Sequence, residues 1–254
     1  LREREHPSLY RVHEGPTPER LVKLRDFLGT FGFQLGGGDT PKAQDYAKLL
    51  EKIGQRPDRQ LLQTVMLRSL RQAIYSPDNV GHFGLAYESY THFTSPIRRY
   101  PDLLVHRAIK SALAGRRYEP AGGENAWEEV GLQCSKTERR ADEATRDVED
   151  WLKCFYMKDR VGEIFEGSIS SVVPFGIFVA LDGVFVEGLV HVSELGHDYF
   201  HFDEKSHAMV GERSGRRFRL SDRVRVQLTR VDMEANKIDF RLADALPAPG
   251  KKRH

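Results

Sequence analysis

The hydrophobic pattern of this chain changes abruptly after Arg160. Before it, apolar residues recur every three or four positions, as on one face of a helix; after it, they alternate with polar residues, as in strands. One kind of element cannot satisfy both periods, so a helical part must be followed by an all-β part. The sequence therefore predicts an α+β protein with a mostly helical domain over residues 1–160, a five-stranded β-barrel over 161–245 and a basic tail at 246–254.

Capping residues next to proline, with glycine at the far end, predict the helices of the first part. They place helices over residues 18–29, 41–54, 58–74 and 102–114, with a strand-like segment at 82–90. The glycines at 36–38 lie between the first two helices. They lack the lysine-serine/threonine ending of a phosphate-binding loop, so we interpret them as a flexible connection.

The longest helix is predicted from Trp127 to Phe155. Its apolar and small residues follow each other at steps of three and four, which gives an amphipathic helix of about 45–50 Å. The small residues Ala141 and Ala144 in the seam favour close packing inside one domain. The opposite face carries mixed charges and is expected to be solvated.

The stretch from Tyr90 to Lys110 places two cations at an expected helix N-terminus, where cations are disfavoured. Ser95-Pro96 has the pattern of a helix N-cap and first residue, which would place Arg98 and Arg99 in the first turn, where the helix dipole disfavours cations. An anion would satisfy both the arginines and the free N–H groups there. The alternative is that both arginines point to solvent or pair with an acid such as Asp102.

In the β part, Phe175 and Phe178 flank Gly176 and Ile177. Because strand residues alternate between faces, the two rings can share a surface only beside a turn or a bulge, which Gly176 permits. Exposed aromatic rings near Lys and Arg on a small barrel are typical of single-stranded nucleic-acid binding. The alternative is that both phenylalanines belong to the core.

The run EGSISSVVPFGIFVAL, then GLVHVSEL, then DRVRVQLTRVDMEANKIDFRL resembles the RNA-binding OB fold of the ribosomal-protein S-one type across residues 161–243. The resemblance implies RNA contacts by Phe175, Phe178 and His191, and less directly by Asp232 and Lys237. Residues 196–222 depart from the compact version. We expect an extra hairpin there, with a basic segment at 215–219 and a loosely metal-like spacing of His197, Asp198, His201 and Asp203.

The run HFGLAYESYTHFTSPIRRYPDLLVHRAIK is similar to the signature of the ribonuclease II / ribonuclease R family of 3′→5′ exoribonucleases, and the resemblance covers residues 7–243. It implies that 1–160 is the C-terminal part of the catalytic RNB domain. Family members are processive, magnesium-dependent hydrolases that release nucleoside 5′-monophosphates from single-stranded RNA. The resemblance implies that Arg98, the arginine of SPIR, contacts the scissile phosphate, and that Arg99, grouped with the RNA-binding residues, has a supporting or structural role.

The family's metal-binding aspartate cluster has no counterpart within residues 1–80, where Asp39, Asp45 and Asp58 are isolated. The chain also starts at Leu1 without an initiator methionine, so we expect a piece of a longer protein. We therefore expect Mg²⁺ in the full-length family enzyme but none on this segment, which should bind RNA without degrading it unaided. Expected partners are single-stranded RNA, the missing N-terminal half, and trans-translation or RNA-decay complexes.

Two other functions remain open. One is a non-catalytic RNA-binding protein with an OB module; the other is a hydrolase with its own carboxylates around Glu88, Asp102 and Asp147. A net charge of only +2 means that RNA must be met by a local patch. No apolar run approaches 18 residues, and Cys134 and Cys154 are expected to be reduced core thiols, which together predict a cytoplasmic protein without membrane contact.

Overall fold

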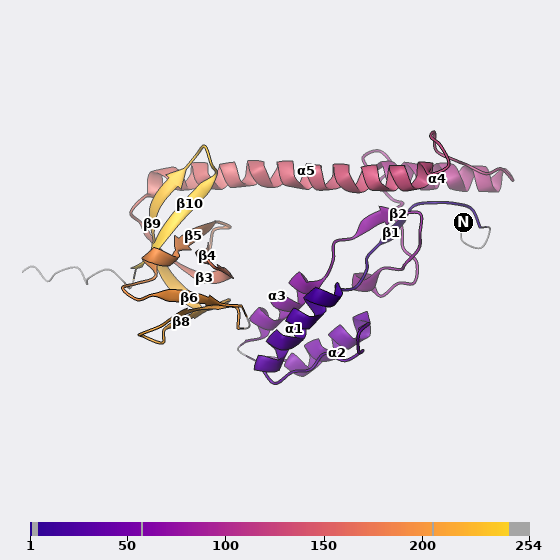
Figure 1. Ribbon diagram of the computed structural model, residues 1–254. Coiled ribbons are helices and arrows are strands. Elements are labelled where there is room, and N and C mark those ends of the chain that lie inside the picture. The colour runs from indigo at the N-terminus through magenta and orange to yellow at the C-terminus, as the bar shows by residue number, and fades with distance from the viewer. Residues whose placement is uncertain (2–4, 57, 205, 244–254) are drawn as a thin grey trace, which may run out of the picture. The chain divides into compact units, whose positions relative to one another are not determined.

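The computed structural model describes residues 1, 5–56, 58–204 and 206–243, which form two compact units (Figure 1). The first unit comprises Leu1–Leu28, Phe33–Arg56 and Leu62–Glu143, and the second comprises Gly29–Gly32, Pro57–Leu61 and Ala144–His254. The predicted basic tail at 246–254 lies outside the described residues. Within the described part, no helix combines the length and the apolar character that crossing a membrane requires.

Three helices follow one another early in the chain: α1 (Pro18–Thr30), α2 (Ala43–Ile53) and α3 (Arg59–Ser69). The third is shorter than predicted, because Ile74 lies in a strand. Strand β2 (Ile74–Ser76) pairs antiparallel with β1 (Tyr10–Val12). The Tyr75 N–H donates to the Ser135 hydroxyl at 2.9 Å, and both residues are buried, which holds this segment extended.

The segment 82–90 is not the predicted strand but contains the short 3₁₀ helix η2 (Phe83–Leu85). Helix α4 (Tyr100–Leu113) follows it. Leu104 of α4 is fully buried and packs with Leu9 and Trp127 in a small core of the first unit.

Helix α5 (Ala126–Met157) has the predicted extent but not the predicted burial. Its apolar seam is buried at Trp127, yet Ala141, Ala144 and Val148 are exposed. The expectation of close packing by these small residues is therefore wrong. At the far end of the helix, Cys154 is buried again.

Five strands of the second unit close into a barrel, in the order β10-β5-β4-β3-β9. Their bounds are β3 (Ile164–Val173), β4 (Gly176–Leu181), β5 (Glu187–His191), β9 (Arg223–Asp232) and β10 (Lys237–Leu242). The short helices η3 (Lys158–Arg160) and η4 (Val192–Glu194) precede β3 and follow β5. The predicted α+β class and five-stranded OB barrel are confirmed.

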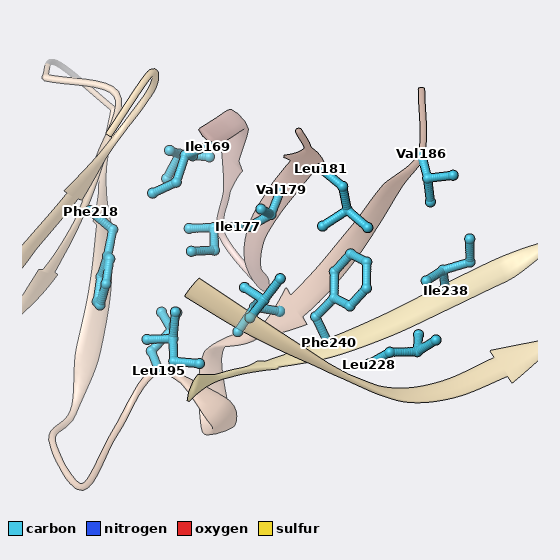
Figure 2. Packing of buried hydrophobic residues seen from close by; sticks show 14 of the residues in the cluster. Ile169, Ile177, Val179, Leu181, Val186, Leu195, Phe218, Leu228, Ile238 and Phe240 are labelled. Carbon is cyan, nitrogen blue, oxygen red and sulfur yellow. The ribbon is translucent and has the colours of Figure 1, made fainter. Parts of the chain in front are cut away.

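Residues 196–222, which differ from the compact OB pattern, form a three-stranded antiparallel sheet and not the expected two-stranded hairpin. Its strands are β6 (Phe200–Asp203), β7 (Ala208–Gly211) and β8 (Arg217–Arg219). Phe218 of β8 is buried in the same apolar cluster as the barrel residues Ile169 and Ile177 (Figure 2). The inserted sheet therefore shares the barrel's core.

Parallel pairing of β5 with β10 closes the barrel, with Leu189 opposite Asp239 and Val190 opposite Phe240. The pairing requires a close approach at Gly188. A Cβ at this position would lie 2.5 Å from Cε2 of Phe240 and 2.7 Å from the backbone oxygen of Ile238. Since the oxygen belongs to the strand itself, the contact cannot be relieved by rotating a side chain.

We predict that Gly188→Ala lowers the free energy of unfolding of the barrel by about 1–3 kcal/mol, as overpacking of a closed core does. Urea unfolding of the chain measures it. Gly123→Ala is the matched control, because a Cβ there meets nothing within 4 Å. Equal stability of the two variants would show that closure does not depend on this approach.

Candidate nucleic-acid interface

Three of the predicted RNA-binding residues lie on one outer face of the barrel. Side chains of directly paired strand residues point to the same face, and so do residues two positions apart. Phe178 pairs with Leu189, which in turn pairs with Asp239. His191 and Lys237 are two positions from these residues on β5 and β10, so they share the face with Phe178.

Phe175 joins this face from the two-residue turn between β3 and β4, where Val173 pairs with Gly176. Its ring lies 6.3 Å from that of Phe178, at an interplanar angle of 85°. The side chain of Phe175 is 49% exposed, and neither ring belongs to the barrel core. The core interpretation is therefore wrong. The turn brings the rings together; the irregularity of register lies in β3, between Ile169 and Ser171, and not at Gly176.

A hollow of about 340 Å³ opens beside the two rings. Lys237 lines it, and so do Asp150 and Lys153 from the last turns of α5. The remaining lining residues are Cys154, Glu187, Gly188, Leu189, Asn236, Ile238 and Asp239. The hollow thus combines aromatic surface, two lysines and carboxylates, a mixture suited to bases and the sugar-phosphate chain rather than to a fully apolar ligand.

Asp232 stabilises the turn between β9 and β10. Its carboxylate accepts the backbone N–H groups of Glu234 and Ala235 at 3.1 and 3.0 Å and pairs with Arg230 at 2.6 Å. The bond from Ala235 is the largest reason why the pKa of Asp232 is lowered. Asp232 thereby shapes the turn from which Lys237 emerges. Direct RNA contact by either residue, or by His191, stays a prediction.

The SPIR segment forms a single turn and not the start of a long helix. The backbone N–H groups of Arg98 and Arg99 both reach the carbonyl of Ser95, at 3.3 and 3.0 Å. Helix α4 then begins at Tyr100, with Arg99 as its N-cap. The arginines therefore do not lie in the first turn of the long helix. Pro101, which has no N–H for a continuous helix, separates the SPIR turn from the helix predicted over 102–114, and that helix is present as α4.

A buried carboxylate fixes this turn. Asp102 is fully buried and accepts the backbone N–H of Ser95 and the guanidinium of Arg99, each at 2.8 Å. Arg98 lies beside them but is exposed, and among the described residues no hydrogen bond or ion pair engages its side chain. The structure therefore separates the two arginines: Arg99 is neutralised by Asp102, whereas Arg98 remains available to an external anion.

A second network supports the approach to this turn, and sequence reasoning missed it. Arg11 pairs with Glu138 of α5 at 2.7 Å and covers the ring of Tyr75, whose hydroxyl lies 2.8 Å from Nδ1 of His92. Burial, aided by Glu138, raises the pKa of Tyr75 to about 12. Burial also lowers the pKa of His92, and Arg99 adds to that effect. Because Arg11 and Glu138 are 127 positions apart, no sequence pattern could have connected them.

Asp198, one of the candidate metal ligands within residues 196–222, fixes a turn. Asp198 accepts hydrogen bonds from the hydroxyl and N–H of Ser214 and from the N–H of Arg213, and these bonds, the hydroxyl's first, lower the pKa of Asp198 to about 2. It caps the β7–β8 turn. In the part of the chain that the structure describes, no group of three or more His, Cys, Asp or Glu side chains could hold a metal ion.

Comparison with known proteins identifies two domains in the chain. Residues 1–115 match the RNB domain and residues 158–242 match the S1 RNA binding domain. Ribonuclease R of Escherichia coli is 52% identical over 252 residues, which cover 96% of this chain and 31% of that protein. The chain thus spans about a third of the length of such relatives.

Solved structures of related proteins share the fold of this chain. Mycoplasma genitalium RNase R in complex with ribose methylated single-stranded RNA superposes with a TM-score of 0.82 at 26% identity, over 95% of this chain and 38% of that one. Yeast Ssd1, described as a pseudonuclease, has a TM-score of 0.62 at 22% identity over 82% of this chain and 26% of its own, and shows a shared fold.

We predict that substitution of Asp102 lowers the stability of the first unit far more than substitution of Arg98. Asp102→Ala leaves the Arg99 guanidinium without its carboxylate and should cost about 3–5 kcal/mol in the free energy of unfolding. Arg98→Ala, an exposed change four residues away, should stay within about 0.5 kcal/mol of the wild type. Urea unfolding compares them, and similar losses would contradict the assignment of Arg98 to an external anion.

Proposed function

The chain belongs to the ribonuclease R family, matching a C-terminal segment of it, and on this premise we propose that it is the RNA-binding part of a 3′→5′ exoribonuclease that acts on single-stranded RNA. The observation that supports this most is the outer barrel face, where two aromatic rings outside the core lie beside Lys237 and a hollow. The single-stranded RNA bound to the Mycoplasma genitalium relative is consistent with it.

Binding should depend on stacking and charge and not on base identity. Every base offers a flat face to Phe175 and Phe178, and Lys237 meets the backbone, whereas Lys153 is paired with Asp150 at 2.8 Å. Contacts of this kind do not read base edges, so sequence preference should be slight. Each phosphate that is neutralised releases counterions, so affinity should fall steeply with salt.

In the first unit, Arg98 is proposed to hold a phosphate of the RNA. A guanidinium presents a planar fork that matches two phosphate oxygens, and Arg98 is exposed with no anion among the described residues to compete. Asp102 positions it indirectly, by fixing the turn and neutralising Arg99. Where negative charge develops on a phosphoryl group, such a donor contributes about 2.7–4 kcal/mol to transition-state stabilisation.

The hydrolysis in this family is expected to use Mg²⁺, which would stabilise the charge on the phosphate. The described residues do not supply a cluster for such an ion. Asp102, considered above with Glu88 and Asp147 for a separate carboxylate site, is buried and engaged by Ser95 and Arg99. We therefore propose that these 254 residues bind RNA and contribute Arg98, and that the metal is held elsewhere in the family enzyme, whose product would be nucleoside 5′-monophosphates.

The second candidate is a non-catalytic RNA-binding protein. Its support is the shared fold with Ssd1, because a pseudonuclease shows that this architecture exists without nuclease activity. Both candidates use the same barrel face, so RNA binding alone does not separate them. Their difference lies in whether Arg98 accelerates cleavage when metal ligands are present.

We predict that Phe175→Ala and Phe178→Ala each weaken binding of a single-stranded RNA by about 1–3 kcal/mol, the value of one lost base stack. Fluorescence anisotropy with a labelled oligouridine measures it at fixed salt. Phe185→Ala is the matched control, since Phe185 is 98% exposed on the same barrel but lies in the β4–β5 loop. Unchanged affinity in the double variant would remove the face from the proposal.

Catalysis is tested in a chimera in which this chain replaces the matching 31% of Escherichia coli ribonuclease R. We predict that the chimera shortens a 3′-tailed RNA and that Arg98→Ala slows it about 10²–10³-fold, as loss of a transition-state donor does. Arg98→Lys should remain slow because it lacks the fork. The chain alone with Mg²⁺ should leave the RNA intact. An inactive but folded chimera would favour the non-catalytic alternative, and Arg98-dependent cleavage by the chain alone would contradict the assignment of the metal.

A further inference from the structure

Two aromatic rings are stacked on an exposed flank of α5, outside the interface described above. Trp151 and Phe155 lie 5.4 Å apart between ring centroids, at an interplanar angle of 20°. Their side chains are 44% and 49% exposed. Large aromatic residues usually bury most of their surface, so a parallel pair held open to solvent requires an explanation.

Packing against the barrel does not provide that explanation. Cys154 and Met157, on the same two turns of the helix, are buried in the barrel core. Successive helical residues are rotated by about 100°, so Phe155 points well away from Cys154. The helix is therefore already anchored to the barrel through Cys154 and Met157, and the aromatic pair takes no part in that packing.

The pair lies next to the candidate RNA face. Asp150, Lys153 and Cys154, which line the hollow beside Phe175 and Phe178, alternate along the helix with Trp151 and Phe155. One flank of these two turns thus borders the hollow, and the adjacent flank carries the aromatic pair. Trp151 lies three positions before Cys154 and so about 60° from it around the helix, whereas Lys153 lies nearly opposite Trp151; the hollow and the aromatic flank therefore adjoin at Cys154.

One cation lies at the edge of the pair, although Asp147 and Asp159 are also four positions from Trp151 and Phe155. The ammonium of Lys158 lies 3.9 Å from the ring centroid of Phe155. No carboxylate within the described residues pairs with Lys158. The nearby Arg160 pairs with Glu163 at 3.0 Å and covers the ring of Tyr156, so it adds less free charge. An aromatic platform with one unpaired cation at its edge has the parts that a base and its phosphate require.

We propose that Trp151, Phe155 and Lys158 form a second base-stacking site for single-stranded RNA, which continues the path from Phe175 and Phe178 onto α5. The proposal rests on the function proposed for the barrel face. A base stacks on Trp151, Phe155 holds the indole ring in place, and Lys158 meets the backbone. The site therefore lengthens the bound RNA beyond the barrel, and short oligonucleotides that fill only the barrel face do not reach it.

Tryptophan fluorescence tests this in the whole chain. The second tryptophan, Trp127, is only 9% exposed, and its indole N–H has no partner among the described residues. The substitution Trp127→Phe therefore removes no hydrogen bond and leaves Trp151 as the sole fluorescent reporter. We expect oligouridines of increasing length to quench this signal only above the length that fills the barrel face, on the order of 4–16 nucleotides.

Affinity provides the second measurement. Trp151→Ala should weaken a long oligouridine roughly 5- to 150-fold and leave a short one unchanged, as expected for one lost stack. Leu152→Ala is the matched control, because Leu152 is 52% exposed on the same helix and cannot stack. Trp151→Tyr should recover much of the affinity. If Phe175→Ala lowers the affinity for the long oligouridine and Trp151→Ala does not, this proposal is wrong and the proposed function of the barrel face is retained.

One rival occupant of the flank is another protein surface, including a second copy of the chain. Light scattering on the same variants separates it from RNA. If Trp151→Ala lowers the molar mass in solution while RNA quenching and affinity stay as in the wild type, the pair is a protein contact and the proposal is wrong. A monomer at all concentrations, with length-dependent quenching, supports the RNA site.

Discussion

The closure of the barrel by parallel pairing of β5 with β10 is the constraint on which the proposed interface depends. Only this pairing brings Lys237 of the last strand beside Phe178, although 59 positions separate them. It is possible because Gly188 lets the two strands approach to a distance that a methyl group would prevent. That Lys237 and Phe178 line the same hollow thus depends on the absence of a side chain at position 188.

In the first unit, the proposed phosphate contact of Arg98 depends on the buried carboxylate of Asp102. It fixes the SPIR turn through the N–H of Ser95 and cancels the charge of Arg99. A single buried acid therefore divides a pair of adjacent arginines into one structural and one available residue. Charge counting over the whole chain, with its net +2, would not have found this difference.

Local periodicity predicted the α+β class and the extent of α5, whereas the closed barrel, which depends on the distant pairing of β5 with β10, was implied by the resemblance to the OB fold. Sequence alone failed where tertiary contacts decide. Ile74 continues a helical pattern but is held in a strand through Tyr75 and Ser135. The seam of α5 looks uniformly apolar, yet Ala141 and Ala144 are exposed. Whether Phe175 was core or surface could not be decided from its spacing, because that depends on a two-residue turn.

The central claim is that RNA lies on the outer face of β4, β5 and β10. Mapping amide chemical-shift changes by NMR while an oligouridine is added tests it most directly. We predict that the largest changes fall on residues 175–178, 189–191 and 237–239, with small ones on the inserted sheet. Changes concentrated on β6–β8 and its arginines, with the three barrel strands unaffected, would contradict it.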